Sequence, residues 1–234
     1  MRSAALRERY TEVCESLHAA CQKYGRAPSS VRLLAVSKKH AVEDMLALYG
    51  FGQQIFGENY VQEALGKAAV LTASGLEPER ILHLIGHLQS KKAAQVAGRF
   101  ALIHSLDSRH LADALEKRLA DGALQPVLIE VNIGDEPQKS GLAAQDLEAF
   151  AEYLQEHCPH LELQGLMCLP PVFDAGERAR PYFARLRKLN EALRTKTGLL
   201  LPELSMGMSG DYQAAIAEGA TIVRIGTAIF GPRI

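Results

Sequence analysis

Hydrophobic and polar positions follow two alternating patterns along this chain. Short runs of apolar and β-branched residues are each followed by a longer segment in which apolar positions recur every three or four residues. The short runs predict buried parallel strands, and the longer segments predict amphipathic helices. Eight strands are expected, at residues 31–36, 54–56, 81–85, 101–104, 127–131, 163–167, 203–206 and 222–225.

Helices are expected before, between and after these strands. One amphipathic helix opens the chain and ends at Gly25, and the others are expected at residues 41–51, 60–74, 90–98, 108–120, 143–157, 175–195 and 211–218. This alternation predicts a parallel sheet covered by helices. Eight units in 234 residues fit a single (β/α)₈ TIM-type barrel with an extra N-terminal helix, although strand count alone also allows an open doubly wound sheet. No Gly-, Ser- or Pro-rich linker divides the chain, so residues 1–234 are expected to form one domain.

Composition narrows the class of protein. With 47% hydrophobic and 23% charged residues the chain matches ordinary globular proteins, and a net charge of −1 does not favour nucleic acid as a partner. No signal peptide and no apolar stretch of membrane-spanning length are present, so we expect a cytoplasmic protein without membrane contact. The four cysteines lack a Cys-x-x-Cys spacing, and no metal site is expected.

The residues that follow the strands are the candidates for chemistry, because active sites of such barrels lie at the carboxyl ends of the strands. Most of the residues at these positions are polar. The candidates are Lys38, Asn59, His87, Gln89, Asp107, Asn132, Cys168, Ser209, Gly226 and Thr227.

Lys38 is the strongest of these candidates. Side chains alternate along a strand, so Lys38 points into the barrel if Val36 does. A lysine at an apolar barrel mouth loses hydration, which lowers the pKa of its ammonium group and favours attack on an aldehyde. The alternative is an ordinary surface pair with Lys39.

The last two strands add a second group of candidates. Ile222, Arg224 and Gly226 share one face, so either Arg224 or its β-branched neighbours enter the barrel. A buried arginine needs a partner, which could be a ligand or a structural carboxylate. Ser209 and Thr227 follow strands seven and eight, where such barrels commonly bind phosphate. Ser209 could also cap the helix that follows it.

Seven segments carry a resemblance to a known family. They are 34–38 (Leu-Ala-Val-Ser-Lys), 56–63 (Phe-Gly-Glu-Asn-Tyr-Val-Gln-Glu), 85–90 (Ile-Gly-His-Leu-Gln-Ser), 139–141 (Lys-Ser-Gly), 165–167 (Gly-Leu-Met), 207–209 (Gly-Met-Ser) and 223–231 (Val-Arg-Ile-Gly-Thr-Ala-Ile-Phe-Gly). In these seven segments the sequence resembles the pyridoxal phosphate homeostasis proteins, also known as the YggS/PROSC family. Their fold is similar to the barrel domain of alanine racemase.

The resemblance implies a set of cofactor-binding residues. Lys38 would carry pyridoxal 5′-phosphate (PLP) as a Schiff base, and Arg224 would face the pyridine nitrogen. Ser209, Gly226 and Thr227 would hold the phosphate, and Asn59 would line the pocket.

Three functions are compatible with these residues. The first is PLP homeostasis: a carrier that binds PLP and hands it to PLP-dependent apo-enzymes, without dedicated catalysis and without catalytic residues. The second is an amino-acid racemase, which needs an acid or base on each face of the cofactor; neither Tyr60 nor Tyr212 is a persuasive second base. The third is a Schiff-base aldolase that acts on a sugar phosphate. A second β-rich domain of the alanine racemase kind is not seen, so a monomer is expected.

Overall fold

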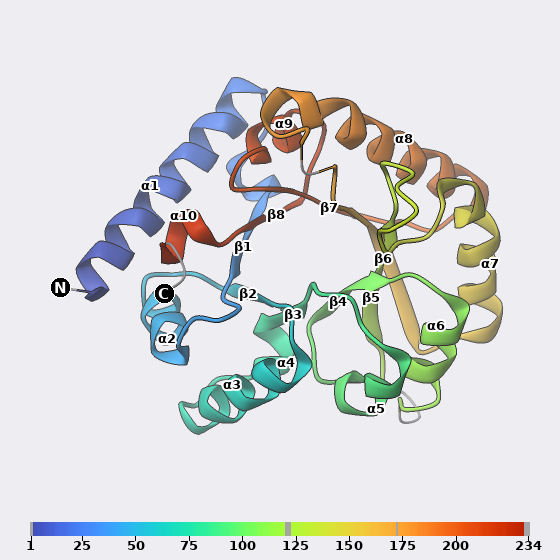
Figure 1. The fold of residues 1–234 in the computed structure, drawn as a ribbon, viewed down its shortest axis with the longest axis horizontal. Coiled ribbons are helices and arrows are strands. Elements are labelled where there is room, and N and C mark those ends of the chain that lie inside the picture. Colours follow the sequence, from blue (N-terminus) through green and yellow to red (C-terminus); the bar gives the residue numbers. More distant parts are fainter. Residues whose placement is uncertain (1, 120–122, 172, 232–234) are drawn as a thin grey trace.

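The computed structural model describes residues 2–119, 123–171 and 173–231, and it shows a closed barrel of parallel strands surrounded by helices (Figure 1). The strands follow one another around the barrel in chain order, and β1 closes the ring by pairing with β8. They are β1 (Arg32–Val36), β2 (Ile55–Glu58), β3 (Leu82–Leu84), β4 (Leu102–Leu106), β5 (Gln125–Val131), β6 (Leu161–Cys168), β7 (Glu203–Met208) and β8 (Ile222–Ile225). The closed ring confirms the predicted barrel and excludes the open sheet.

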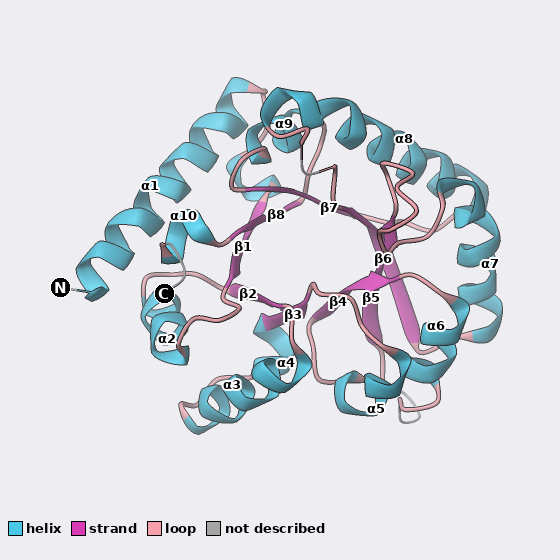
Figure 2. Ribbon diagram, in the orientation of Figure 1, coloured by secondary structure: helices cyan, strands magenta, loops and turns pink. Residues whose placement is uncertain are grey.

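The helices form the outer layer (Figure 2). They are α1 (Arg2–Lys23), α2 (Val42–Gly50), α3 (Val61–Ala73), α4 (Pro78–Ile81), α5 (Ala93–Val96), α6 (Arg109–Glu116), α7 (Leu147–His157), α8 (Arg180–Thr197), α9 (Tyr212–Ala217) and α10 (Thr227–Phe230), with short 3₁₀ helices η1 (Pro28–Ser30), η2 (Ser90–Lys92), η3 (Ala144–Asp146) and η4 (Gly176–Ala179).

The extra N-terminal helix α1 packs against α9 and α10, near the other end of the chain. The side chain of Arg9 donates a hydrogen bond to the carbonyl of Ile229, and Arg26 donates to those of Ile216 and Ala220. These contacts hold the last two βα units, which carry several of the candidate residues, against the start of the chain.

Two apolar layers hold the barrel together. The larger layer lies between the strands and the helices and includes Phe56, Ile103 and Phe183. The smaller one fills the barrel interior and consists of Leu34, Leu102, Leu128, Met167 and Ile222. Because side chains alternate along a strand, the residues two and four positions after an interior residue also face the barrel axis or its mouth. This periodicity brings Lys38 and Arg224 to the inside.

The sequence located all eight strands but misjudged several boundaries. β3 starts one residue later than predicted because Ile81 belongs to the separate helix α4, and it ends one residue earlier, at Leu84. Residues 90–98 form η2 and α5, which ends at Val96, and not one helix. The helix predicted at 108–120 ends at Glu116, and residue 120 lies outside the described residues. α10, directly after β8, was not predicted at all.

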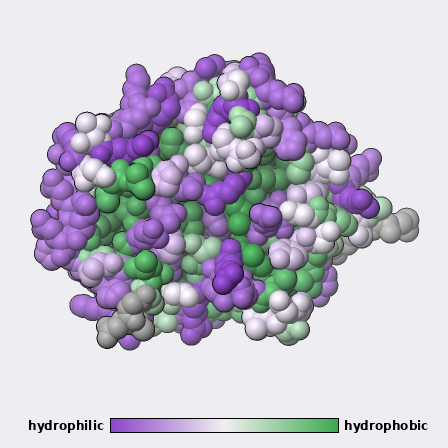
Figure 3. Space-filling model, turned by 180° about the vertical axis from the view of Figure 1, so that it is seen from behind, coloured by the Kyte–Doolittle hydropathy of each residue, from purple (hydrophilic) through white to green (hydrophobic). Residues whose placement is uncertain are grey.

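The described residues contain no helix long and apolar enough to cross a membrane. The reverse face of the molecule is mostly hydrophilic, with apolar areas between polar side chains (Figure 3).

Candidate functional site

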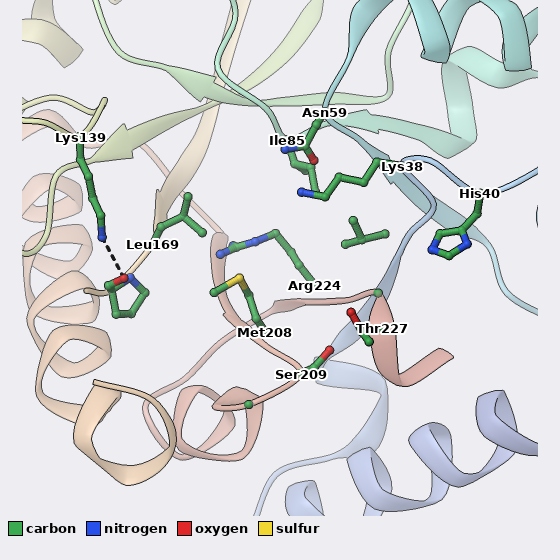
Figure 4. Close-up of a pocket in the computed structure, with 14 residues that line it drawn as sticks. Lys38, His40, Asn59, Ile85, Lys139, Leu169, Met208, Ser209, Arg224 and Thr227 are labelled. Carbon is green, nitrogen blue, oxygen red and sulfur yellow. Dashed lines mark hydrogen bonds between the residues drawn. The ribbon is translucent and has the colours of Figure 1, made fainter. Parts of the chain in front are cut away.

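A pocket of about 460 Å³ opens at the carboxyl ends of the strands (Figure 4). All six residues predicted to bind a cofactor line it, although they come from four strand ends spread over nearly 200 residues of sequence. The complete lining is Val36, Lys38, His40, Asn59, Ile85, Lys139, Leu169, Pro170, Met208, Ser209, Gly210, Arg224, Gly226 and Thr227.

Lys38 lies in the tight turn that follows β1. The amide of His40 donates to the carbonyl of Ser37, and Lys39 adopts a left-handed conformation with φ of 61°. The turn separates the two lysines. Lys38 is half-buried and points into the cavity, whereas the ammonium group of Lys39 lies 5.8 Å from the centre of the exposed Tyr60 ring. The interpretation of residues 38 and 39 as an ordinary surface pair is therefore wrong for Lys38.

A buried ionic cluster supports this turn from behind. The ammonium group of Lys67 donates to the carbonyl of Ser37 at 2.7 Å and to the carboxylate of Glu58 at 2.6 Å. The Ser37 hydroxyl donates to the same Glu58 oxygen. Burial raises the pKa of Glu58, while the hydrogen bonds from Lys67 and Ser37 oppose that shift. The cluster fixes the backbone immediately before Lys38, and so fixes where the Lys38 side chain starts.

Arg224 enters the barrel, which decides the orientation that the sequence left open. Its guanidinium group donates to the Ser205 hydroxyl at 2.7 Å and to the carbonyl of Cys168 at 2.9 Å. Only 4% of the residue is exposed, and burial lowers the pKa of its guanidinium group. None of the described carboxylates forms a salt bridge with it. A cation buried among neutral partners leaves its charge available to whatever occupies the pocket.

Ser209, Gly226 and Thr227 form one edge of the pocket, after β7 and β8. The side-chain hydroxyls of Ser209 and Thr227 lie at this edge in Figure 4. Asp211, and not Ser209, occupies the N-cap position of α9, and its carboxylate accepts a hydrogen bond from the Met208 amide at 2.6 Å. The prediction that Ser209 could cap this helix is therefore wrong, because the tight turn at 208–211 places Ser209 outside the helix.

Asn59 supplies a test of whether the pocket fits a polar ligand. Its side-chain oxygen is buried and finds no hydrogen-bond partner among the described residues. The backbone at Gly86, after β3, lies very close to the Asn59 backbone. A Cβ atom added to Gly86 would lie 2.4 Å from the main-chain carbonyl oxygen of Asn59, so only glycine fits there. A side-chain amide with an unmet hydrogen bond, lining the same pocket as a buried cation, suits a ligand with polar substituents.

Several lining residues were not predicted. Lys139 belongs to the Lys-Ser-Gly segment, but nothing in the sequence showed that the loop after β5 folds back toward the pocket; its ammonium group donates to the carbonyl of Pro170. Met208 and Leu169 would have been found by extending the predicted seventh and sixth strands by two residues each.

Other polar residues after the strands do not line the pocket. His87 and Asp107 pair with each other at 3.3 Å, and Asn132 bonds within its own loop. Neither Tyr60 nor Tyr212 is part of the lining; the hydroxyl of Tyr212 pairs with Ser16 of α1. No group of side chains suited to a metal ion occurs among the residues that the structure describes.

Comparison with known proteins gives consistent matches. The family described as alanine racemase, N-terminal domain, matches residues 16–233. The pyridoxal phosphate homeostasis protein of Aquifex aeolicus is 43% identical over 227 residues, covering 97% of each chain.

Solved structures agree with these sequence matches. The structure of PipY from Synechococcus elongatus with PLP bound is 36% identical, covers 97% of this chain and 100% of PipY, and has a TM-score of 0.82. Alanine racemase from Corynebacterium glutamicum shares the fold with a TM-score of 0.68 at 20% identity, and this chain corresponds to 60% of its length.

Proposed function

Because this chain belongs to the family of pyridoxal phosphate homeostasis proteins, we propose that it binds PLP in the pocket at the barrel mouth and acts in PLP homeostasis. One observation carries the proposal: the fold brings Lys38, Asn59, Ser209, Arg224, Gly226 and Thr227 to the lining of a single pocket. A relative with the same fold is described with PLP bound.

Each residue has a role that its chemistry supports. Lys38 would hold PLP through its amine, as a Schiff base with the aldehyde carbon of the cofactor and with release of water. The hydroxyls of Ser209 and Thr227 donate to the phosphate, together with backbone N–H groups near Gly226. Asn59 offers its amide to a polar substituent of the ring.

Arg224 sets the chemical character of the site. A guanidinium group only donates hydrogen bonds and does not give up its proton, so it holds the ring nitrogen as an acceptor and leaves it unprotonated. PLP supplies an electron sink to amino-acid chemistry, and that sink is weaker when the ring nitrogen carries no proton. Arg224 therefore favours storage of the cofactor over catalysis on it.

The pocket lining also supports a carrier over an amino-acid racemase. A racemase needs an acid or base on the face of the cofactor opposite Lys38, and the lining contains no tyrosine among the described residues. We propose further that the protein is a cytoplasmic monomer, that residues 1–234 act as one domain, and that PLP-dependent apo-enzymes receive the cofactor.

Absorbance spectroscopy of the protein with added PLP tests this function. We expect a visible band that disappears on borohydride treatment, with peptide mapping then locating the reduced adduct on Lys38. An adduct on another lysine would contradict the assignment of the site, and absence of any adduct would contradict PLP binding through a Schiff base. Chiral analysis of amino acids incubated with the loaded protein should show no racemisation.

A further inference from the structure

A chain of hydrogen bonds continues from Arg224 into the barrel interior. The Arg224 guanidinium donates to Ser205, the Ser205 hydroxyl lies 2.9 Å from Nδ1 of His104, and Nε2 of His104 lies 2.9 Å from Nδ1 of His83. The four residues come from β8, β7, β4 and β3. Each is at most 4% exposed, so bulk water does not compete for these bonds.

The chemistry of the four groups fixes the direction of this chain. Arg224 can only donate, so the Ser205 oxygen accepts from it. Among the described residues the Ser205 hydroxyl has hydrogen-bond partners only in Arg224 and His104, so the hydroxyl must donate its hydrogen bond to Nδ1 of His104. His104 then carries its hydrogen on Nε2 and donates to Nδ1 of His83.

Both histidines are held in the neutral form that this direction requires. Burial lowers the pKa of His83 to about 3 and lowers the pKa of His104 well below its ordinary value. The positive charges of Arg224 and Arg32 lower the pKa of His104 further. A doubly protonated His104 would donate from both ring nitrogens, so the hydrogen bond between His104 and Ser205 would run in the opposite direction.

We propose that Ser205 and His104 are positioning residues for Arg224: because Nδ1 of the neutral His104 accepts the hydrogen bond from the Ser205 hydroxyl, the lone pairs of that hydroxyl face Arg224 and orient its guanidinium group toward the pocket. A carboxylate at the same place would also hold Arg224, but it would neutralise the charge. The neutral chain orients the cation and leaves its charge to the ligand. The proposal rests on the proposed function in one respect, that Arg224 meets the ring nitrogen of PLP.

The direction of the chain is measurable without any ligand. Nitrogen-15 NMR of the cofactor-free protein, labelled on histidine, distinguishes the two neutral tautomers, and the His104→Gln variant assigns the His104 signals. We expect His104 and His83 to be neutral, with hydrogen on Nε2, across about pH 5–8. Hydrogen on Nδ1 of His104, or a charged His104 in this range, would overturn the proposal.

The effect on the site is measured with a matched pair of serines. Ser205→Ala removes the link in the chain, whereas Ser105→Ala removes an equally buried hydroxyl that donates to the Gly86 carbonyl outside it. The two ligands are PLP and its 1-deaza analogue, in which a C–H group replaces the ring nitrogen.

We expect Ser205→Ala to weaken PLP binding about five- to tenfold and to leave the deaza analogue unchanged. Ser105→Ala should change neither affinity by more than about twofold, and Ser205→Thr, which keeps the hydroxyl, should restore PLP binding. Equal weakening of both ligands, or no weakening of PLP, would overturn the positioning role. If the unmodified protein does not bind PLP, the proposed function fails, but the histidine tautomers measured by NMR still test the direction of the hydrogen-bond chain. If Ser205→Ala does not fold, the NMR measurement alone tests that direction.

Discussion

The barrel mouth has two halves that differ in how their polar side chains are satisfied. The pocket half comprises the ends of β7, β8, β1 and β2, which carry the six candidate residues, while Ile85, Lys139 and Leu169 complete the lining from other strand ends. In the pocket half the Asn59 side-chain oxygen has no partner among the described residues, and Arg224 donates only to neutral groups. In the loop half, formed by β3, β4 and β5, the polar groups bind one another. His87 pairs with Asp107, and the Ser140 hydroxyl donates to Glu130.

This difference separates binding from structure. The side chain of Asn132 both donates to the Glu136 carbonyl and accepts from the Glu136 amide, which folds the loop after β5. Asn132 therefore supports the structure of its loop, whereas the Asn59 side-chain oxygen has no partner among the described residues and faces the pocket as a candidate ligand contact. Substitutions in the pocket half should change ligand binding, and substitutions in the loop half should change stability.

The largest effect is expected for Lys38→Ala in the pocket half. The variant should lose the visible band and the borohydride-reducible adduct completely, because no other amine is assigned to the aldehyde. Its thermal unfolding temperature should stay within about 2 °C of the unmodified protein, since a half-buried side chain at the open face contributes little to packing. Mass spectrometry after reduction measures the adduct; a reducible adduct in this variant would refute the role of Lys38.

The next largest effect is expected when Ser209 and Thr227 are both replaced by alanine. Each hydrogen bond to a charged group contributes about 1.5–3 kcal/mol, so PLP affinity should fall about a hundredfold or more. Affinity for pyridoxal, which lacks the phosphate, should hardly change. Titration of both ligands by absorbance makes the comparison, and equal weakening would mean that the phosphate lies elsewhere.

A loop-half variant should reverse this pattern. Asn132→Ala removes two hydrogen bonds to the Glu136 backbone and should lower the unfolding temperature by about 3–6 °C. PLP affinity should change less than about threefold, although the loop also carries Lys139 of the pocket lining. Calorimetry and PLP titration of the same sample measure both effects, and a large loss of affinity with unchanged stability would break the division between the halves.

Glu130→Gln should raise the unfolding temperature at higher pH but not at low pH. Burial raises the pKa of Glu130, so the folded protein binds this proton more tightly than the unfolded chain does. The resulting stabilisation is complete below the unfolded pKa and is lost as the pH rises through the folded pKa. Glutamine stays neutral and keeps an acceptor for Ser140, so the variant should unfold about 1–3 °C higher at about pH 8 and show no such advantage near pH 4. A pH-independent difference would contradict this account.

Lys39→Ala should have the smallest effect and serves as the control for Lys38. The Lys39 side chain lies over Tyr60 outside the pocket lining, so the adduct and the PLP affinity should remain within about twofold of the unmodified protein. A loss comparable to that of Lys38→Ala would show that the turn after β1 does not separate the two lysines as described.

The barrel was readable from the sequence because each βα unit carries its own local pattern of apolar residues. The eight strands follow from the periods of strand and helix, whereas the same periods place Lys38 inside the barrel only if Val36 also faces inward. The short helices α4, α5 and α10 were missed or merged, since one turn of helix has too few residues to establish a period.

The six candidate residues were predicted from the polar positions after the strands and from the family resemblance, and all six line the pocket. The sequence could not decide whether Arg224 enters the barrel. It also could not show that Arg224 contacts Ser205 there, or that Ser205 contacts His104. Nor could it show that Asn132 bonds within its own loop and that Asp107 pairs with His87, while the Asn59 side-chain oxygen has no partner among the described residues. Local periodicity sets which way a side chain faces, but whether a buried polar group finds a partner depends on strands distant in sequence, and only closure of the barrel brings those together.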